Sequence, residues 1–310
     1  MSYKPSSEVS GLSPNILING GMDFWQRGTT FTNPVTVSYA ADRWKIGISG
    51  GSPTSTVTKD TTDFDTGTAS LKVNITVTGG ATVYFVQQIL ENYENYRNKT
   101  VTFTVRVKCS SAGLIQSNIF DGVTNTNSAV NVGTGWETLT VIKTLSSAIA
   151  NLAVYVGFIP NLGGSTSASV STFNVDSAMM VVGSEPTAFI PKDTQVELAQ
   201  CQRYYQILGG NAASEYVAPG WCWTTALCDS VYRFGVPMRV TPTVTFFNQT
   251  GWRLYTAAGG GINAIAVSLA GSSSRHVGLT VQVASGIVAG NATIIWLQDG
   301  TSYATFSAEI

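Results

Sequence analysis

The segment TVTFTVRVKC (Thr100–Cys109) decides the fold class, because polar and apolar residues alternate along it. A period of two puts one set of side chains on each face of a β-strand, so one face of this strand is expected to be buried. Similar runs, bounded by Gly, Asn, Ser and Asp, occupy Ser70–Thr78, Thr82–Leu90, Thr138–Lys143, Leu152–Phe158 and Ser171–Val182. Many short strands with few helices predict an antiparallel all-β sandwich or jelly roll.

One helix is predicted within PKDTQVELAQCQRYYQIL (Pro191–Leu208). Thr194 and Glu197 have the spacing of a capping box, and Gly209 is suited to end the helix. Spacings of three, four and three predict an apolar stripe of Leu198, Cys201, Tyr205 and Leu208. The stripe favours either a linker helix that lies on a sheet or a self-associating oligomer seam, and both remain open.

The chain has 310 residues, enough for about two domains of roughly 150 residues each. We expect a polar N-terminal docking arm over residues 1–14 and a jelly-roll β-sandwich over residues 15–190. The connecting helix follows over residues 191–208. Strand-like runs then resume, so we expect a smaller C-terminal β-sandwich over residues 209–310.

The chain is poor in charge: charged residues make up 11% of it, and the formal net charge is −1, where about 25% charged residues is typical. With 44% hydrophobic residues, it is expected to fold around a core. No basic field favours nucleic acid or an anionic membrane. No apolar run reaches the ~18 residues of a spanning helix. We therefore expect neither nucleic-acid binding nor membrane insertion.

The four cysteines, Cys109, Cys201, Cys222 and Cys228, lack the spacing of a metal site. The N-terminus also lacks the apolar segment of a secretory signal. We therefore expect four free thiols in a protein made in a reducing compartment. His276 is the only histidine, and we interpret it as a loop residue rather than part of a catalytic triad or zinc site.

Several segments resemble a β-sandwich module that is widespread in phage tail fibres and related virion appendages. NILINGGMDFWQRGTTFTN (Asn15–Asn33) and YAADRWKIG (Tyr39–Gly47) resemble its opening. FNVDSAMMVVGSEPTAF (Phe173–Phe189) resembles its closing strands, and VELAQCQRYYQ (Val196–Gln206) is similar to the helix that follows. The resemblance covers about two thirds of the chain. It implies a galactose-binding-like jelly roll, similar to carbohydrate-binding modules, in a virion protein that is usually a trimer.

The resemblance also implies a structural calcium site at Asn19, Asp23 and Asp176, because related jelly rolls often hold Ca²⁺ between the N-terminal segment and the last strand. Ca²⁺ takes about six to eight oxygen ligands. The alternative is that Asp23 caps a turn and Asp176 faces solvent. We expect no other cofactor.

The C-terminal part is rich in aromatic residues. The candidate receptor-binding residues are Tyr216, Trp221, Trp223, Trp252 and Tyr255, with Tyr232 nearby. In a strand, Trp221 and Trp223 would share a face. Aromatic side chains beside Gly, Ser and Asn loops suit the recognition of sugars or surface proteins. The alternative is that they fill the core of a small β-domain.

We therefore expect a non-enzymatic phage virion fibre or appendage protein, made in the host cytoplasm and exposed on the particle. The N-terminal arm would dock on other virion proteins. The helix would lie near the axis of a homo-oligomer, taken to be a trimer, and the C-terminal domain would bind a bacterial surface glycan or protein.

Two alternatives remain open. The first is a capsid decoration or head-fibre protein with the same module. The second is a capsule-degrading glycoside hydrolase, which needs two carboxylates around a sugar. Asp63, Asp65, Glu91 and Glu94 are available, but nothing in the sequence singles out a pair.

Overall fold

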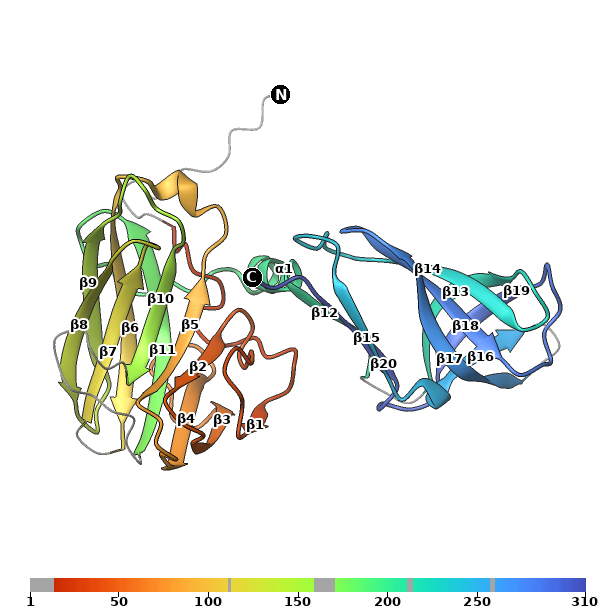
Figure 1. The fold of residues 1–310 in the computed structure, drawn as a ribbon, viewed down its shortest axis with the longest axis horizontal. Helices are drawn as coiled ribbons and strands as arrows, with labels where there is room; N and C mark the ends of the chain where they lie inside the picture. The colour runs from red at the N-terminus through yellow and green to blue at the C-terminus, as the bar shows by residue number, and fades with distance from the viewer. Residues whose placement is uncertain (1–13, 111–112, 159–170, 211–213, 257–259) are drawn as a thin grey trace. The chain divides into compact units, whose positions relative to one another are not determined.

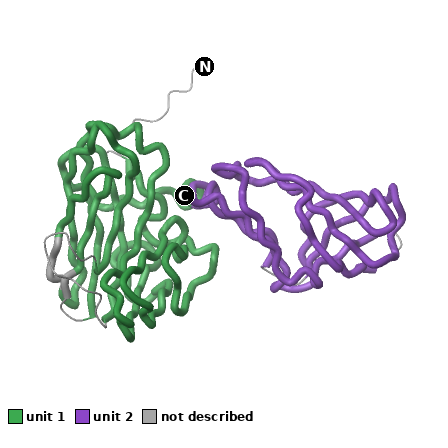
Figure 2. Tube along the Cα trace, in the orientation of Figure 1, with its two compact units in different colours: residues 1–197 green, residues 198–310 purple. Residues whose placement is uncertain are grey.

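The computed structural model describes residues 14–110, 113–158, 171–210, 214–256 and 260–310. It divides into two compact units, Met1–Glu197 (unit 1) and Leu198–Ile310 (unit 2), shown in different colours in Figure 2. The predicted docking arm, residues 1–14, lies almost wholly outside the described residues. Each helix in the described part of the chain is too short to span a bilayer.

Unit 1 is an antiparallel β-sandwich, so the all-β prediction is confirmed (Figure 1). Its six-stranded sheet contains, in spatial order, β1 (Thr30–Thr32), β3 (Thr54–Asp60), β4 (Ser70–Val77), β11 (Ser171–Val182), β6 (Thr100–Cys109) and β9 (Glu137–Thr144). Its five-stranded sheet contains β2 (Lys45–Ser49), β5 (Val83–Ile89), β10 (Ala153–Phe158), β7 (Gly113–Phe120) and β8 (Asn125–Val132). A short 3₁₀ helix, η1 (Tyr93–Tyr96), precedes β6.

The core of unit 1 lies between these two sheets. In β6 the alternating residues Val101, Phe103, Val105 and Val107 are fully buried, as the sequence pattern predicts. The rings of Phe158 and Phe173 meet edge to face across the core, with centroids 5.5 Å apart. Ser55 Oγ and Tyr84 Oη form a 2.9 Å hydrogen bond that also joins the sheets. Burial of each large apolar side chain stabilises such a core by about 1.5–3 kcal/mol.

The helix α1 spans Thr194–Gln202, so the prediction that it continues to Leu208 is wrong. Tyr205–Gly209 instead forms the strand β12 and pairs with β20 (Tyr303–Ser307). Tyrosine and isoleucine favour strands. The helical spacing of the apolar residues is only weak evidence for a helix, and pairing with the distant strand β20 determines the conformation instead.

The helix also begins differently from the prediction. Asp193, not Thr194, caps it: Asp193 Oδ1 accepts hydrogen bonds from the backbone N–H groups of Gln195 and Val196 at 3.0 and 3.2 Å. The Glu197 carboxylate does not close a capping box but accepts the backbone N–H of Asn19 at 2.6 Å. Glu197 thus ties the first turn of α1 to unit 1.

The predicted oligomer seam is also corrected. Cys201, Tyr205 and Leu208 are buried within the chain itself, and Leu198 is half-buried. In a strand, residues three apart lie on opposite faces, so Tyr205 and Leu208 share no stripe. Leu208 belongs to the core of unit 2. The seam therefore does not exist as an exposed helical surface.

Unit 2 is also all-β, but its strands form a small sheet and a closed barrel rather than two packed sheets. The small sheet contains β12, β20 and β15 (Thr243–Phe247). The barrel contains β13 (Glu215–Cys222), β14 (Leu227–Arg233), β18 (His276–Val283), β17 (Gly261–Ser272), β16 (Trp252–Thr256) and β19 (Ala292–Leu297). A 3₁₀ turn, η2 (Gln249–Gly251), precedes β16. Closure leaves the barrel without open edges.

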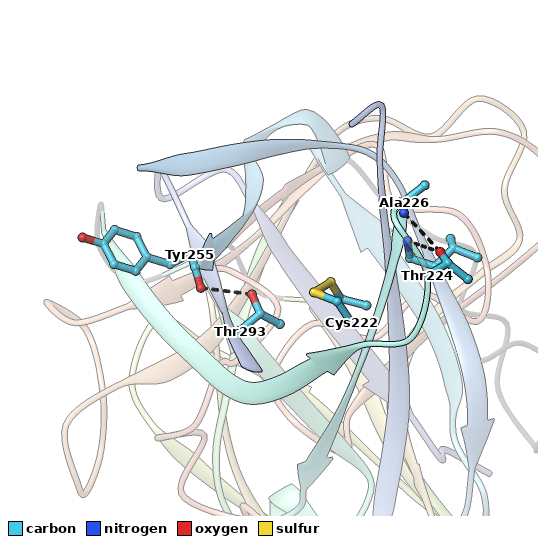
Figure 3. The surroundings of a disulfide bond; sticks show 7 residues. Cys222, Thr224, Ala226, Tyr255 and Thr293 are labelled. Atoms are coloured by element: carbon cyan, nitrogen blue, oxygen red, sulfur yellow. Dashed lines mark hydrogen bonds between the residues drawn. A yellow bond between two sulfur atoms is a disulfide. The ribbon is translucent and has the colours of Figure 1, made fainter. Parts of the chain in front are cut away.

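A disulfide joins Cys222 and Cys228, so the prediction that these two are free thiols is wrong. The two residues are direct partners in the β13–β14 hairpin, with Cα atoms 3.9 Å apart. Figure 3 shows the bond and the Tyr255 ring, which points away from the disulfide. It also shows the Thr224 hydroxyl in the hairpin turn, which accepts a hydrogen bond from the backbone N–H of Ala226. Cys109 and Cys201 are buried thiols that are not part of this disulfide.

Candidate functional site

The outer face of the five-stranded sheet in unit 1 is the candidate site, and strand alternation decides which side chains reach it. In β5, Tyr84 and Val86 are fully buried in the core. Phe85 and Gln87 therefore point to the opposite face, where both are half-buried. By the same rule, Tyr155 of β10 points outward and is half-buried.

The strand register aligns five outward side chains in one row, which we call the polar row: Lys45, Gln87, Tyr155, Asn118 and Asn127. They are consecutive partners across β2, β5, β10, β7 and β8. At ~4.8 Å between strands, the row is about 19 Å long. Three of its members are amides and one is a phenol, so it offers hydrogen-bond donors and acceptors with a single charge, on Lys45.

Two aromatic rings lie on this face. Phe85 and Tyr155 meet edge to face, with centroids 5.0 Å apart and an interplanar angle of 76°. The register places Phe85 between Gly47 and Gly157. A Cβ atom at Gly47 would lie 2.2 Å from the Phe85 ring, so the missing side chain lets the ring extend over β2. Gly157 has a φ of 147°, a conformation that favours glycine.

Buried amides accompany the rings. Gln116 and Asn118 are 0% and 1% exposed although they lie on the outward face of β7. The amide of Asn127 donates to Gln116 Oε1 at 3.4 Å. Asn118 Oδ1 accepts no hydrogen bond from the described residues. A buried acceptor without a donor costs about 1–3 kcal/mol, so a hydroxyl supplied by a ligand or by water would be stabilising there.

Burial raises the pKa of the Tyr155 phenol above its ordinary value. The hydroxyl therefore keeps its proton across the physiological pH range. It is available both to donate and to accept a hydrogen bond on this face.

The predicted calcium residues lie elsewhere, and the structure gives each an internal role. Asn19 braces the turn that follows it: its Nδ2 donates to the backbone oxygens of Phe24 and Asp42 at 2.9 and 3.0 Å. Asp23 Oδ1 accepts the backbone N–H of Thr68 at 3.3 Å and the Thr68 hydroxyl at 2.6 Å.

Asp176 is fully buried, so the alternative that it faces solvent is wrong. Its Oδ2 accepts the backbone N–H groups of Asp65 and Thr66 at 2.8 and 3.0 Å. Burial raises the pKa of Asp176 to about 6, and hydrogen bonds from backbone N–H groups oppose the rise. Asp23 and Asp176 thus both hold the 65–68 loop. Within the described residues no three acidic, Cys or His side chains are grouped for a metal, and calcium binding stays a prediction.

The acids considered for hydrolysis are also engaged or remote. Asp65 forms a two-point ion pair with Arg106, at 2.8 and 2.9 Å, and Asp63 pairs with Lys108 at 2.7 Å. Glu94 lies in η1, and Glu91 precedes that turn. His276 begins β18, is exposed, and contacts Ser273 Oγ through Nδ1 at 3.1 Å.

Two cavities of about 400 and 380 Å³ lie beside the 65–68 loop, and Phe189 lines both. Their cationic side chains already have partners. Arg106 pairs with Asp65, and Lys192 donates to Leu17 O at 2.6 Å. In the polar row, by contrast, Asn118 Oδ1 has no hydrogen-bond donor among the described residues.

The C-terminal aromatic candidates divide into two groups. Trp252 is fully buried, and its indole N–H donates to Phe247 O at 3.2 Å, so its assignment as a receptor-binding residue is wrong. The four others are exposed: Tyr216 65%, Trp221 50%, Trp223 52% and Tyr255 43%. Trp223 lies beyond the end of β13, so strand alternation does not place it with Trp221.

The polar row is not among the sites that the sequence predicts. Its members come from five strands that are far apart in the chain, and only their register aligns them. The available local signals were a glycine inside each of two strand-like runs, Gly47 and Gly157, and the alternating amides Gln116 and Asn118.

No protein-family model matches the sequence, and no curated protein matches it. Solved structures similar to this chain include a CBM4 structure (19% identity, TM-score 0.37), which covers 53% of this chain and 98% of its own length. Another is the xylan-binding CBM22-1 domain of Paenibacillus barcinonensis Xyn10C (10% identity, TM-score 0.35). The match covers 57% of this chain and 100% of that domain. A third is the enzymatically active domain of bacteriophage CBA120 tailspike protein 4 (12% identity, TM-score 0.37). The match covers 55% of this chain and 21% of the tailspike chain. Likenesses this remote assign neither a ligand nor an activity to this chain.

Proposed function

We propose that the protein binds carbohydrate and that the polar row, together with Phe85, is its glycan-binding surface. One observation carries the proposal: Tyr155 lies in a cross-strand row of amides with the Phe85 ring against it, and one amide oxygen, Asn118 Oδ1, has no donor among the described residues. Aromatic faces pack against the C–H groups of a sugar ring. Amides both donate to and accept from its hydroxyls.

The charge of this face favours a neutral glycan. Lys45 is the single charged member of the polar row, at one end. A polyanionic glycan would need cations along its length, because each unpaired charge that leaves water is costly. The length of the row, about 19 Å, suits a short oligosaccharide better than a single sugar.

The row also contains no carboxylate, whereas glycoside hydrolysis requires two. We therefore favour binding over catalysis, and the glycoside hydrolase reading becomes the weaker alternative. Release of reducing sugar from a bound polysaccharide would reinstate it.

The resemblance of Asn15–Asn33, Phe173–Phe189 and Val196–Gln206 to tail-fibre modules motivates the cellular setting of the proposal. In this setting the protein is a virion fibre or appendage, assembled as a homotrimer, and the glycan belongs to the bacterial surface. Three linked weak sites would bind far more tightly than one, without new contacts. A capsid decoration or head-fibre protein remains the alternative, and immunogold labelling of particles would separate the two. A monomeric mass by light scattering would count against the trimer.

The binding test uses the full chain. Neutral oligosaccharides are screened on an array, and the Kd of the best ligand is measured by calorimetry. Phe85→Ala and Tyr155→Ala should each raise the Kd about tenfold or more, equivalent to ~1.4 kcal/mol. Phe64→Ala is the matched control, because Phe64 is an exposed aromatic residue of the 61–69 loop, outside the polar row. Equal affinities for all four proteins would remove the polar row as the site.

A further inference from the structure

The outer wall of the barrel in unit 2 carries a second cross-strand row. In β16, Trp252 and Leu254 are fully buried, so Arg253 and Tyr255 point outward. The register continues from Arg253 to Asn263 of β17 on one side and to Trp296 of β19 on the other. Trp296 in turn pairs with Tyr216 of β13. We call Asn263, Arg253, Trp296 and Tyr216 the barrel row.

Arg253 and Trp296 are stacked in the middle of this row. The Arg253 guanidinium carbon lies 5.3 Å from the centroid of the Trp296 ring, within the range of a cation–π contact. A Cβ atom at Gly261 would lie 2.9 Å from this ring and 3.0 Å from Arg253 Cδ. The absence of a side chain at Gly261 thus lets both groups extend over the end of β17.

The polar atoms of this pair lack partners. Arg253 Nε and Trp296 Nε1 are buried and donate no hydrogen bond within the described residues. No ion pair to Arg253 is present there either. Glu215, which precedes Tyr216, pairs with the fully buried Leu297 and so lies on the other face of β13. A guanidinium without an acceptor is rare where it is partly desolvated, because a buried charge is normally paired.

The surroundings of the pair are aromatic and apolar. Tyr216 is 65% exposed at one end of the row. In the adjacent outward row, Tyr255 (43% exposed) pairs with Ile294 (39% exposed), which pairs with Pro219. A ligand that satisfies both the cation and these flat apolar surfaces must combine an anionic group with a ring that bears C–H faces.

We propose that the barrel row binds an acidic sugar, a pyranose ring that carries a carboxylate. The carboxylate accepts hydrogen bonds from the Arg253 guanidinium, whose planar fork matches its two oxygens. The sugar ring packs on Trp296 and Tyr216, and the Asn263 amide meets its hydroxyls. This site is separate from the neutral-glycan site proposed in unit 1, and neither depends on the other.

The test measures binding of the full chain to oligogalacturonate, followed by Trp fluorescence and calorimetry. The neutral oligosaccharide of the same length should bind at least about tenfold more weakly, as expected from the loss of a charge-assisted hydrogen bond. Arg253→Gln should raise the Kd for oligogalacturonate about tenfold, and Arg253→Lys should recover only part of the affinity because lysine lacks the fork. Arg233→Gln is the matched control, an exposed arginine on β14, and should leave the Kd within about twofold.

Several outcomes would overturn the proposal: no binding of oligogalacturonate by the wild-type chain, equal binding of the neutral oligomer, or an unchanged Kd for Arg253→Gln. Glucose 6-phosphate and inorganic phosphate serve as further probes. Stronger binding of either than of oligogalacturonate would replace the carboxylate sugar by a phosphate ligand. Tyr155→Ala should not change binding of the acidic sugar, whereas it should weaken binding of the neutral glycan, so the two proposals fail separately. Unchanged near-UV circular dichroism confirms that each variant is folded.

Discussion

The polar row of unit 1 and the barrel row of unit 2 use the same geometric arrangement for different chemistry. In each, a glycine leaves room for an aromatic ring to extend sideways: Gly47 in the adjacent strand for Phe85, and Gly261, two strands away in β17, for Trp296. The polar row places neutral amides beside Tyr155, whereas the barrel row places a cation against its Trp296 ring. In both rows the glycine makes room for a flat ring, and the polar or charged side chains beside that ring determine the ligand chemistry that we propose.

The largest expected effect is on the stability of unit 2, and it should differ between tryptophans on the inner and outer faces of the barrel wall. Trp252→Ala removes a fully buried indole and should destabilise unit 2 by about 3–5 kcal/mol. Trp296→Ala, on the outer face, should cost much less stability but abolish binding of the acidic sugar. Urea unfolding followed by circular dichroism compares the two. Similar destabilisation by both would show that Trp296 is a core residue and not part of a surface.

The second effect is pH-dependent and should distinguish the units. The pKa of Asp176 is raised to about 6 in the folded chain, so protonated Asp176 is favoured by folding. Its contribution to stability is complete below about pH 3.9, the unfolded value, and is lost as pH rises through about 6. The loss amounts to about 2 kcal/mol in unit 1 between pH 4 and pH 7.

Two other aspartates, Asp60 and Asp121, make unit 1 less stable as the pH falls, which is opposite to the effect of Asp176. Hydrogen bonds from Thr62 and Lys72 outweigh burial and lower the pKa of Asp60, and backbone N–H groups do the same for Asp121. Their stabilisation is lost as pH falls below about 4. Unit 1 should therefore be most stable near pH 4–5. Differential scanning calorimetry across this pH range measures its unfolding temperature and checks the prediction. Asp176→Asn should remove the decline from pH 4 to pH 7, and a wild-type profile that is flat over this range would contradict the assignment.

The third effect tests the shared role of the glycines. Gly47→Val would force the Phe85 ring from its position, which should destabilise unit 1 by about 1–3 kcal/mol and abolish binding of the neutral glycan. Gly261→Val should weaken only the acidic-sugar site. Gly235→Ala is a control in open space. Retention of both binding activities in the two valine variants would show that neither glycine is needed to position its ring.

The smallest effect concerns a single hydroxyl. Tyr155→Phe keeps the ring beside Phe85 and removes one hydrogen-bonding group, so the Kd for the neutral glycan should rise about three- to tenfold, in line with 0.5–1.5 kcal/mol per hydrogen bond. The affinity for the acidic sugar is the internal control. An unchanged Kd for the neutral glycan would mean that Tyr155 contributes through ring stacking and not through its hydroxyl.

Local pattern predicted the parts of this fold that depend on neighbours in sequence. The alternation of Thr100–Cys109 gave the strand and its buried face correctly. The end of α1 was missed because Tyr205–Gly209 takes its conformation from β20, about 100 residues later. The disulfide was missed because the register of β13 and β14 brings Cys222 opposite Cys228.

The candidate sites were harder to predict for the same reason. Tyr216 and Tyr255 were noticed as aromatic residues, but their relation to Arg253 and Trp296 follows from pairing around the barrel. The polar row needs five strands in register before all of its members are aligned. A single sequence carries no direct signal for such pairing.

The position of β20 has a consequence for the timing of synthesis. It is the central strand of its sheet and pairs with both β12 and β15, yet it follows β12 by about 100 residues. At a ribosomal rate of ~5–20 residues per second, β12 would wait about 5–20 s for its partner. Every strand of unit 1 is complete before β12 emerges. The sandwich can therefore fold on the ribosome while β12 still lacks its partner strand.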